Sequence, residues 1–208
     1  SDPQHLAKVT QGVTTEVLGQ DGLSYVPSNP ETLQQLRGQL FGWNGDPEGF
    51  KWNFNTVGQY LARVDEGAAV NVAYLIPHGT VRMVVRGNEE GVANDDELKQ
   101  MSHLVETGMK EGAFGLSAGL TYVPAIYADD REIIELCKIV AKYGGYYAPH
   151  HRNYGAKFID AVAECLDIAE QSKSPLHLTH CHMSHPNFHD KTHLLFEMLD
   201  KAEAKGVD

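Results

Sequence analysis

The sequence predicts an α/β fold that forms part of a (β/α)8 barrel. Short apolar stretches rich in β-branched residues recur along the chain, and each is followed by a loop and a segment with helical periodicity. This alternation is typical of βα units around a parallel sheet. Polar side chains also gather where the predicted strands end, and in a (β/α)8 barrel all these ends meet on the face that carries out chemistry. A barrel therefore explains the pattern better than a doubly wound sheet.

Five strands are predicted, and helices separate them. The strands cover 13–19, 71–78, 113–119, 145–150 and 176–182. The helices cover 30–40, 56–65, 95–111, 129–143 and 157–171, with a last one near 191–205. Asp95 and Asp129 are expected to cap helix N-termini, and Gly112, Gly144 and Gly206 stand where helices are expected to stop.

The five consecutive parallel strands and flanking helices predict one domain, an incomplete barrel over 1–208. Five strands cannot close an eight-stranded barrel. Either the sequence belongs to a longer chain, or another chain supplies the missing strands. Unpaired sheet edges would also favour self-association. The polar and aromatic segment 24–55, with Trp43 and Trp52, is too long for a simple βα loop and is interpreted as a lid or a surface insertion.

Charge and cysteine content exclude several classes of function. With 17 Lys and Arg against 28 Asp and Glu, the net charge of −11 disfavours nucleic acid and anionic membranes as partners. Three cysteines are too few and too irregularly spaced for a disulfide framework or a cysteine-based zinc module, so a cytoplasmic protein is expected. No apolar run approaches the roughly 20 residues that span a bilayer, and no leader sequence is recognisable.

Histidines at the ends of two neighbouring predicted strands are the strongest chemical signal. Most of the eleven histidines lie between His150 and His193. Side chains alternate along a strand, so His180 and His182 are expected on one side, where His150 from the neighbouring strand can join them. Neutral imidazoles in this arrangement would bind zinc and leave a position for water. The alternative is a set of hydrogen-bonded barrel histidines.

Most other polar residues at strand ends have two interpretations. Asp21 could supply an oxygen ligand to a metal or cap a turn between glycines. Tyr122 could contact substrate or be a buried tyrosine with a satisfied hydroxyl. Arg152 is predicted to contact substrate. The stretch from His78 to Arg82 could line a pocket, or His78 could bond to a neighbouring loop.

Two further histidines and the three cysteines are not expected to carry chemistry. His189 and His193 have the i, i+4 spacing of a helical zinc pair, but no Glu follows His189, and solvated helix histidines are favoured. Cys137 and Cys165 lie within apolar helical patterns and are expected in the core. Cys181 alternates away from its histidine neighbours, and no thiol nucleophile is expected.

Five stretches in order resemble the N-acyl-D-amino-acid deacylases of the metal-dependent amidohydrolase superfamily. They are GVTTEV at 12–17, NVA at 71–73 leading to HGTVR at 78–82, and the stretches 112–122, 144–152 and 175–180. The resemblance implies a (β/α)8 barrel with a small β-sandwich formed by the chain ends. It also implies hydrolysis of N-acyl-D-amino acids to a carboxylate and a free D-amino acid, with one or two zinc ions.

The resemblance also assigns roles to residues. His150 and His180 stand where the family binds its tightly held zinc. Asp21 stands where many members have a cysteine ligand in a Gly-Asn-Cys-Gly turn, and His182 stands where members often carry a lysine that grips substrate. Tyr122 matches a tyrosine near the bound substrate. Asp21 and His182 therefore depart from the common pattern, and a harder carboxylate ligand would change metal affinity and preference.

Two family elements do not occur in the sequence. A His-x-His of the first barrel strand is expected before Ser1, and the aspartate that serves as general base is expected after Asp208. No general base is therefore predicted within the chain, which by itself is expected to be inactive or nearly so. In the intact protein, zinc would activate water and polarise the amide carbonyl. The alternatives are a truncated barrel that binds a ligand or partner without catalysis, and another amidohydrolase of the dihydroorotase or dipeptidase kind.

Overall fold

A four-stranded parallel sheet lies at the centre of the chain, in the order β1-β2-β3-β4. The computed structural model describes all residues except 1–3 and 185, and it leaves out the side chains of 187–189. The strands are β1 (Thr15–Leu18), β2 (Asn71–Pro77), β3 (Gly115–Gly119) and β4 (Tyr146–His150). Consecutive strands are neighbours, which is the arrangement of successive βα units in a barrel. The predicted α/β class is confirmed.

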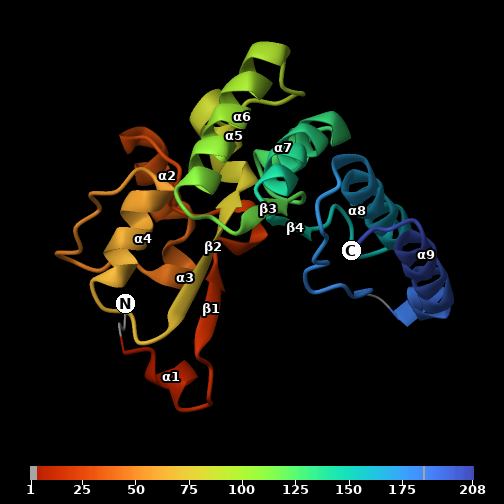
Figure 1. Cartoon of the computed structure of the whole chain (residues 1–208), viewed down its shortest axis with the longest axis horizontal. Helices are drawn as coiled ribbons and strands as arrows, with labels where there is room; N and C mark the ends of the chain where they lie inside the picture. The colour runs from red at the N-terminus through yellow and green to blue at the C-terminus, as the bar shows by residue number, and fades with distance from the viewer. Residues whose placement is uncertain (1–3, 185) are drawn as a thin grey trace.

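In Figure 1 helices lie to the left of this sheet, above it and to its right. The described helices are α1 (Leu6–Val9), α2 (Pro30–Gln39), α3 (Phe41–Asn44), α4 (Val57–Asp65), α5 (His78–Arg86), α6 (Asp95–Lys110), α7 (Asp130–Lys142), α8 (Phe158–Ser172) and α9 (Thr192–Ala204), with short 3-10 turns η1 (Gln20–Gly22), η2 (Ala125–Tyr127) and η3 (Pro186–Lys191). All six predicted helices are present to within about two residues at each end. None in the described part of the chain is long and apolar enough to cross a membrane.

The predicted fifth strand, 176–182, is wrong in extent. The structure has a single parallel bridge there, between Tyr147 and Leu176. The backbone N–H of His177 donates to the carbonyl of Tyr147 at 2.8 Å, but His180 has a φ of 35° and leaves the extended conformation. On its other side Leu176 donates its N–H to the carbonyl of Asp208. The segment therefore meets the edge of β4 only at its start.

Helix ends follow the local chemistry that the sequence suggests, with one correction. Asp129 caps α7 through a hydrogen bond from the N–H of Glu132, as predicted. Asn94, not Asp95, caps α6, because its extended backbone lets its side chain accept two N–H groups while Glu97 bonds back to it. Positive φ angles at the three predicted stop glycines, Gly112, Gly144 and Gly206, confirm those helix ends.

The segment 24–55 packs against the core along much of its length. Trp52 lies 4.8 Å from both Tyr25 and Phe50, measured between ring centroids. In contrast, α3 exposes 62% of Phe41 and 82% of Trp43. One face of the segment is thus an integral part of the hydrophobic core. Its interpretation as a lid stays a prediction.

Candidate metal centre

Asp21, His150 and His180 come together at the end of the sheet. Each offers a ligand atom, and these atoms all lie within 4.8 Å of one another. Asp21 lies in η1 directly after β1, His150 is the last residue of β4, and His180 follows the bridge to Tyr147. Among the described residues, these three side chains form the one group of three or more that could hold a metal ion together. The three residues predicted as metal ligands therefore meet in space.

His150 presents one ring nitrogen to His180 and the other to a hydroxyl. Its Nδ1 lies 2.9 Å from Nε2 of His180, and its Nε2 lies 2.9 Å from Oγ1 of Thr121. Burial lowers the pKa of His150, although the nearby Asp21 carboxylate acts in the opposite direction. A neutral imidazole has one in-plane lone pair, and in the tautomer whose Nε2 donates to Thr121 this lone pair lies on Nδ1, where it can bind a cation.

The turn that carries Asp21 is fixed by contacts from other strands. Asp21 has a φ of 61°, and its Oδ1 is buried without a hydrogen-bond partner in the described part of the chain. The N–H of Gly22 donates to Oγ of Ser117 at 3.0 Å, and Gln20 Nε2 donates to Oγ1 of Thr179 at 2.8 Å. This last bond joins the turn to the segment of His180. A buried carboxylate oxygen with no donor is an available ligand for a cation.

The donor set fits a zinc ion. Two imidazole nitrogens and a carboxylate oxygen are usual zinc ligands, and a catalytic site needs three protein ligands and a free position. Ligand nitrogens at a tetrahedral zinc are about 3.3 Å apart, which follows from bonds of about 2.0–2.1 Å. His150 Nδ1 and His180 Nε2 are 2.9 Å apart. The rings would have to separate by only a few tenths of an ångström.

Two of the predicted substrate residues lie beside this group. The hydroxyl of Tyr122 is 3.2 Å from Nδ1 of His150. Burial and the charge of Asp21 raise the pKa of Tyr122, so its phenol stays protonated at neutral pH. His182 is exposed, and its Nδ1 lies 2.6 Å from the carbonyl oxygen of His180.

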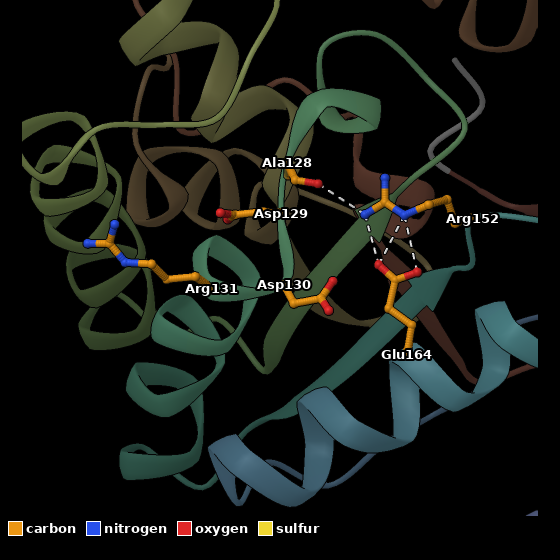
Figure 2. A pocket seen from close by; sticks show the side chains of 6 residues that line it. All are labelled: Ala128, Asp129, Asp130, Arg131, Arg152 and Glu164. Carbon is orange, nitrogen blue, oxygen red and sulfur yellow. Dashed lines mark hydrogen bonds and ion pairs between the residues drawn. The ribbon is translucent and has the colours of Figure 1, made fainter.

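Arg152 binds other partners in this structure, and its contact with substrate stays a prediction. Figure 2 shows its guanidinium against the carboxylate of Glu164 from α8, with distances of 2.8 Å from Nη2 and 3.0 Å from Nε to the same oxygen. The guanidinium also donates to the carbonyls of Ile126 and Ala128. Arg152 therefore ties the loop after β4 to the loop after β3. Arg152 and Asp130 both line an open cavity of about 630 Å³. Burial and the neighbouring Glu164 raise the pKa of Asp130.

Tyr154 is a neighbour of the metal-ligating group that the sequence did not single out. Its hydroxyl lies 2.8 Å from Nε2 of His180. Its ring centroid is 4.8 Å from that of His150 and 5.1 Å from that of His182. The only signal in the sequence is a tyrosine four positions after His150, in a loop at the end of a strand. Such positions in barrels often contact ligands.

His151 is the residue directly after β4, next to His150. It is fully buried, packs against Tyr154 and Phe158, and places its Nδ1 3.2 Å from the carbonyl of Asn153. Burial lowers its pKa to about 4, so the ring is neutral. His151 is part of the packing that supports the loop.

The stretch 78–82 begins α5 and does not extend β2. His78, Arg82 and Glu132 form a network with exposures of 0%, 0% and 1%. His78 Nε2 lies 2.6 Å from one carboxylate oxygen of Glu132, and Arg82 donates to the other. Of the two interpretations of His78, the hydrogen-bonded one is observed, although its partner is a side chain of α7 and not a loop carbonyl. The network joins α5 to α7.

The remaining predictions concern histidines and cysteines outside the metal-ligating group. His193 is exposed and places Nδ1 2.8 Å from the carbonyl of Asp190, which agrees with a solvated helix histidine. The side chain of His189 lies outside the described residues. Cys137 and Cys165 are buried as predicted, and burial raises both of their pKa values. Cys181 is half-buried.

Comparison with known proteins identifies relatives along nearly the whole chain. D-aminoacylase of Alcaligenes xylosoxydans xylosoxydans is 36% identical over 186 residues, which are 87% of this chain and 37% of the relative. N-acyl-D-aspartate deacylase of the same organism is 32% identical over 97% of this chain and 40% of its own length. The chain thus spans about two fifths of these curated relatives. No model of a protein family matches it.

Solved structures show the same relationship. N-acyl-D-glutamate deacylase from Bordetella bronchiseptica, complexed with zinc and a phosphonate that mimics the tetrahedral intermediate, superposes with a TM-score of 0.86 at 25% identity and covers all of this chain. A D-aminoacylase described as defining a novel subset of amidohydrolases has a TM-score of 0.80 at 29% identity over 98% of this chain. These matches extend over 42% and 43% of the solved chains. The four strands therefore correspond to part of an amidohydrolase barrel.

Proposed function

Because the chain is homologous to the N-acyl-D-amino-acid deacylases, we propose that the protein is a zinc-dependent amidohydrolase that hydrolyses the amide bond of N-acyl-D-amino acids. The products are a carboxylate and a free D-amino acid. The relatives include enzymes named for D-aspartate and D-glutamate derivatives as well as a D-aminoacylase. The shared substrate class is the N-acyl-D-amino acid, and the proposal is made at that level.

The convergence of Asp21, His150 and His180 is the observation that supports this function. The three residues are far apart in the sequence, yet their ligand atoms lie within 4.8 Å of one another. They stand at the carboxyl ends of parallel strands, where barrel enzymes hold their reacting groups. Oδ1 of Asp21 accepts no hydrogen bond within the described residues and lies 4.0 Å from Nδ1 of His180, so it can turn toward a cation held by the two histidines.

Residues of this chain would hold the cation and orient the substrate. Asp21, His150 and His180 are the proposed ligands, and bound zinc would act as a Lewis acid toward the amide carbonyl. Thr121 orients the ring of His150, since its hydroxyl hydrogen-bonds the nitrogen that faces away from His180. Tyr122 and His182 are the proposed substrate contacts.

Zinc content and stereospecific hydrolysis test this proposal in the full-length protein. We expect bound zinc and hydrolysis of N-acetyl-D-amino acids but not of the L-isomers. Replacing His180 by alanine should lower kcat/KM about 10³-fold or more, because metal polarisation contributes several kcal/mol to transition-state stabilisation. Zinc content should fall in parallel.

His193→Ala is the matched control. It removes an exposed imidazole from the first turn of α9, away from the metal-ligating group, and should leave both zinc content and turnover unchanged. Undiminished hydrolysis by the His180→Ala protein would overturn the ligand assignment. Hydrolysis by wild-type protein without any divalent metal would overturn the metal-dependent mechanism.

A further inference from the structure

Two phenol hydroxyls meet the two nitrogens that face each other in the metal-ligating group. Tyr154 lies 2.8 Å from Nε2 of His180, and Tyr122 lies 3.2 Å from Nδ1 of His150. The two nitrogens are 2.9 Å apart. Four polar atoms from three loops therefore share a small volume. The role of Tyr122 is part of the proposed function, whereas Tyr154 has none.

A cation in this group would deprive Tyr154 of its partner. A ring nitrogen carries either a hydrogen or one in-plane lone pair. Once Nε2 of His180 gives that lone pair to a metal ion, it can neither accept from nor donate to the hydroxyl of Tyr154. The hydroxyl must then find another acceptor, because a desolvated polar group without a partner is costly.

Packing keeps the ring of Tyr154 in the site when this bond is lost. Its centroid lies 4.1 Å from that of His151, 4.8 Å from that of His150 and 5.1 Å from that of His182. His151 is fully buried and so provides a fixed surface for the ring. The hydroxyl can rotate but the ring cannot leave. Its new acceptor must be an atom close to the position of the cation.

We propose that Tyr154 is a catalytic residue whose hydroxyl donates a hydrogen bond to the acyl oxygen of the substrate. This inference rests on the proposed function, because only an amide substrate brings such an oxygen to the cation. The substrate carboxylate is separated from that oxygen by several bonds, whereas Tyr154 adjoins a ligand nitrogen. Negative charge develops on the acyl oxygen during attack on the carbonyl, so the hydrogen bond strengthens in the transition state.

Tyr154→Phe tests this role, since phenylalanine keeps the ring and removes the hydroxyl. Full-length zinc-loaded protein is titrated with the N-methylphosphonyl analogue of its N-acetyl-D-amino acid substrate. We expect the variant to bind this phosphonate about 100-fold more weakly, with a similar fall in kcat and little change in KM. Tyr143→Phe is the control, because Tyr143 lies at the C-terminal end of α7 and its hydroxyl donates to Glu106 of α6.

Zinc affinity distinguishes this role from simple support of His180. A hydroxyl that must leave Nε2 before zinc binds cannot strengthen zinc binding, so the Tyr154→Phe protein should bind zinc at least as tightly as wild type. A residue that orients a ligand would instead lower zinc affinity about 10- to 100-fold on removal. That loss, or unchanged phosphonate affinity, would overturn the inference. Wild-type protein that binds neither zinc nor phosphonate would overturn the proposed function itself.

Discussion

Replacing Glu132 by glutamine removes the carboxylate that faces His78 and Arg82 in the protein interior. Glu132 is 1% exposed and the other two are fully buried. In the variant, the guanidinium of Arg82 keeps its charge but loses its counter-ion. Removal of one partner from a buried pair costs about 3–5 kcal/mol, which is a large part of a typical folding free energy of about 5–15 kcal/mol. We therefore expect the free energy of unfolding of Glu132→Gln to be lower than that of wild type by this amount, measured by urea unfolding followed by circular dichroism.

Glu135→Gln is the control on the same helix. Glu135 pairs with Lys138 at 2.7 Å on the surface, with 45% of its side chain exposed. An exposed pair of this kind contributes at most about 1 kcal/mol. If the two variants lost the same free energy of unfolding, with an unchanged slope of that free energy against urea concentration, the buried network would not contain a stabilising charge pair.

The contribution of the Glu132 carboxylate to the free energy of unfolding should also depend on pH. Burial raises the pKa of Glu132, but the hydrogen bonds and charges of His78 and Arg82 outweigh this and hold the pKa below its ordinary value. A depressed pKa gives a stabilising contribution that is complete above the unfolded-state value of about 4.3 and disappears as the pH falls through the folded-state value. The difference between wild type and Glu132→Gln should therefore shrink as the pH falls below about 4. A constant difference down to pH 2 would contradict this.

Two further predictions concern the loops around the metal-ligating group. Gly22→Ala should lower zinc affinity about 10- to 100-fold, because its Cβ would lie 2.3 Å from the backbone nitrogen of Gly119. The control is Gly144→Ala, which has a similar positive φ but open space around the Cβ. It should lower the free energy of unfolding by about 1 kcal/mol and leave zinc affinity unchanged. Glu164→Gln should release Arg152 and increase hydrogen exchange in residues 121–128, measured by mass spectrometry, and unchanged exchange there would show that Arg152 does not hold this loop.

Hydrophobic periodicity was enough to predict four strands and six helices, but it failed where buried residues left no periodicity. The start of α5 is fully buried from His78 to Met83, and no side chain caps its N-terminus. Its β-branched residues fit a strand as well as a helix. The contact of Arg82 with Glu132, 50 positions later, helps fix the helix there, and sequence spacing does not show such a contact.

Residue type and position at strand ends predicted that His150 and His180 meet, and the resemblance to the deacylases added Asp21, but neither assigned every neighbour. Arg152 has the position of a substrate ligand, yet Glu164 from the following helix binds its side chain. Tyr154 has no motif and enters the group through ring packing against His151. Contacts between side chains of different helices and loops cannot be inferred from the spacing of residues along one strand.

The alternation of side chains along a strand predicted the meeting of His150 and His180, but the structure achieves it differently. His180 lies beyond the bridge and has a φ of 35°, and Asp21 has a φ of 61°. A residue in a sparsely populated conformation costs about 1–3 kcal/mol and persists only where its surroundings over-determine it. Here the bond from Gln20 to Thr179 joins the residues that precede each of them. Both positions belong to the metal-ligating group, and this bond holds the two turns next to each other.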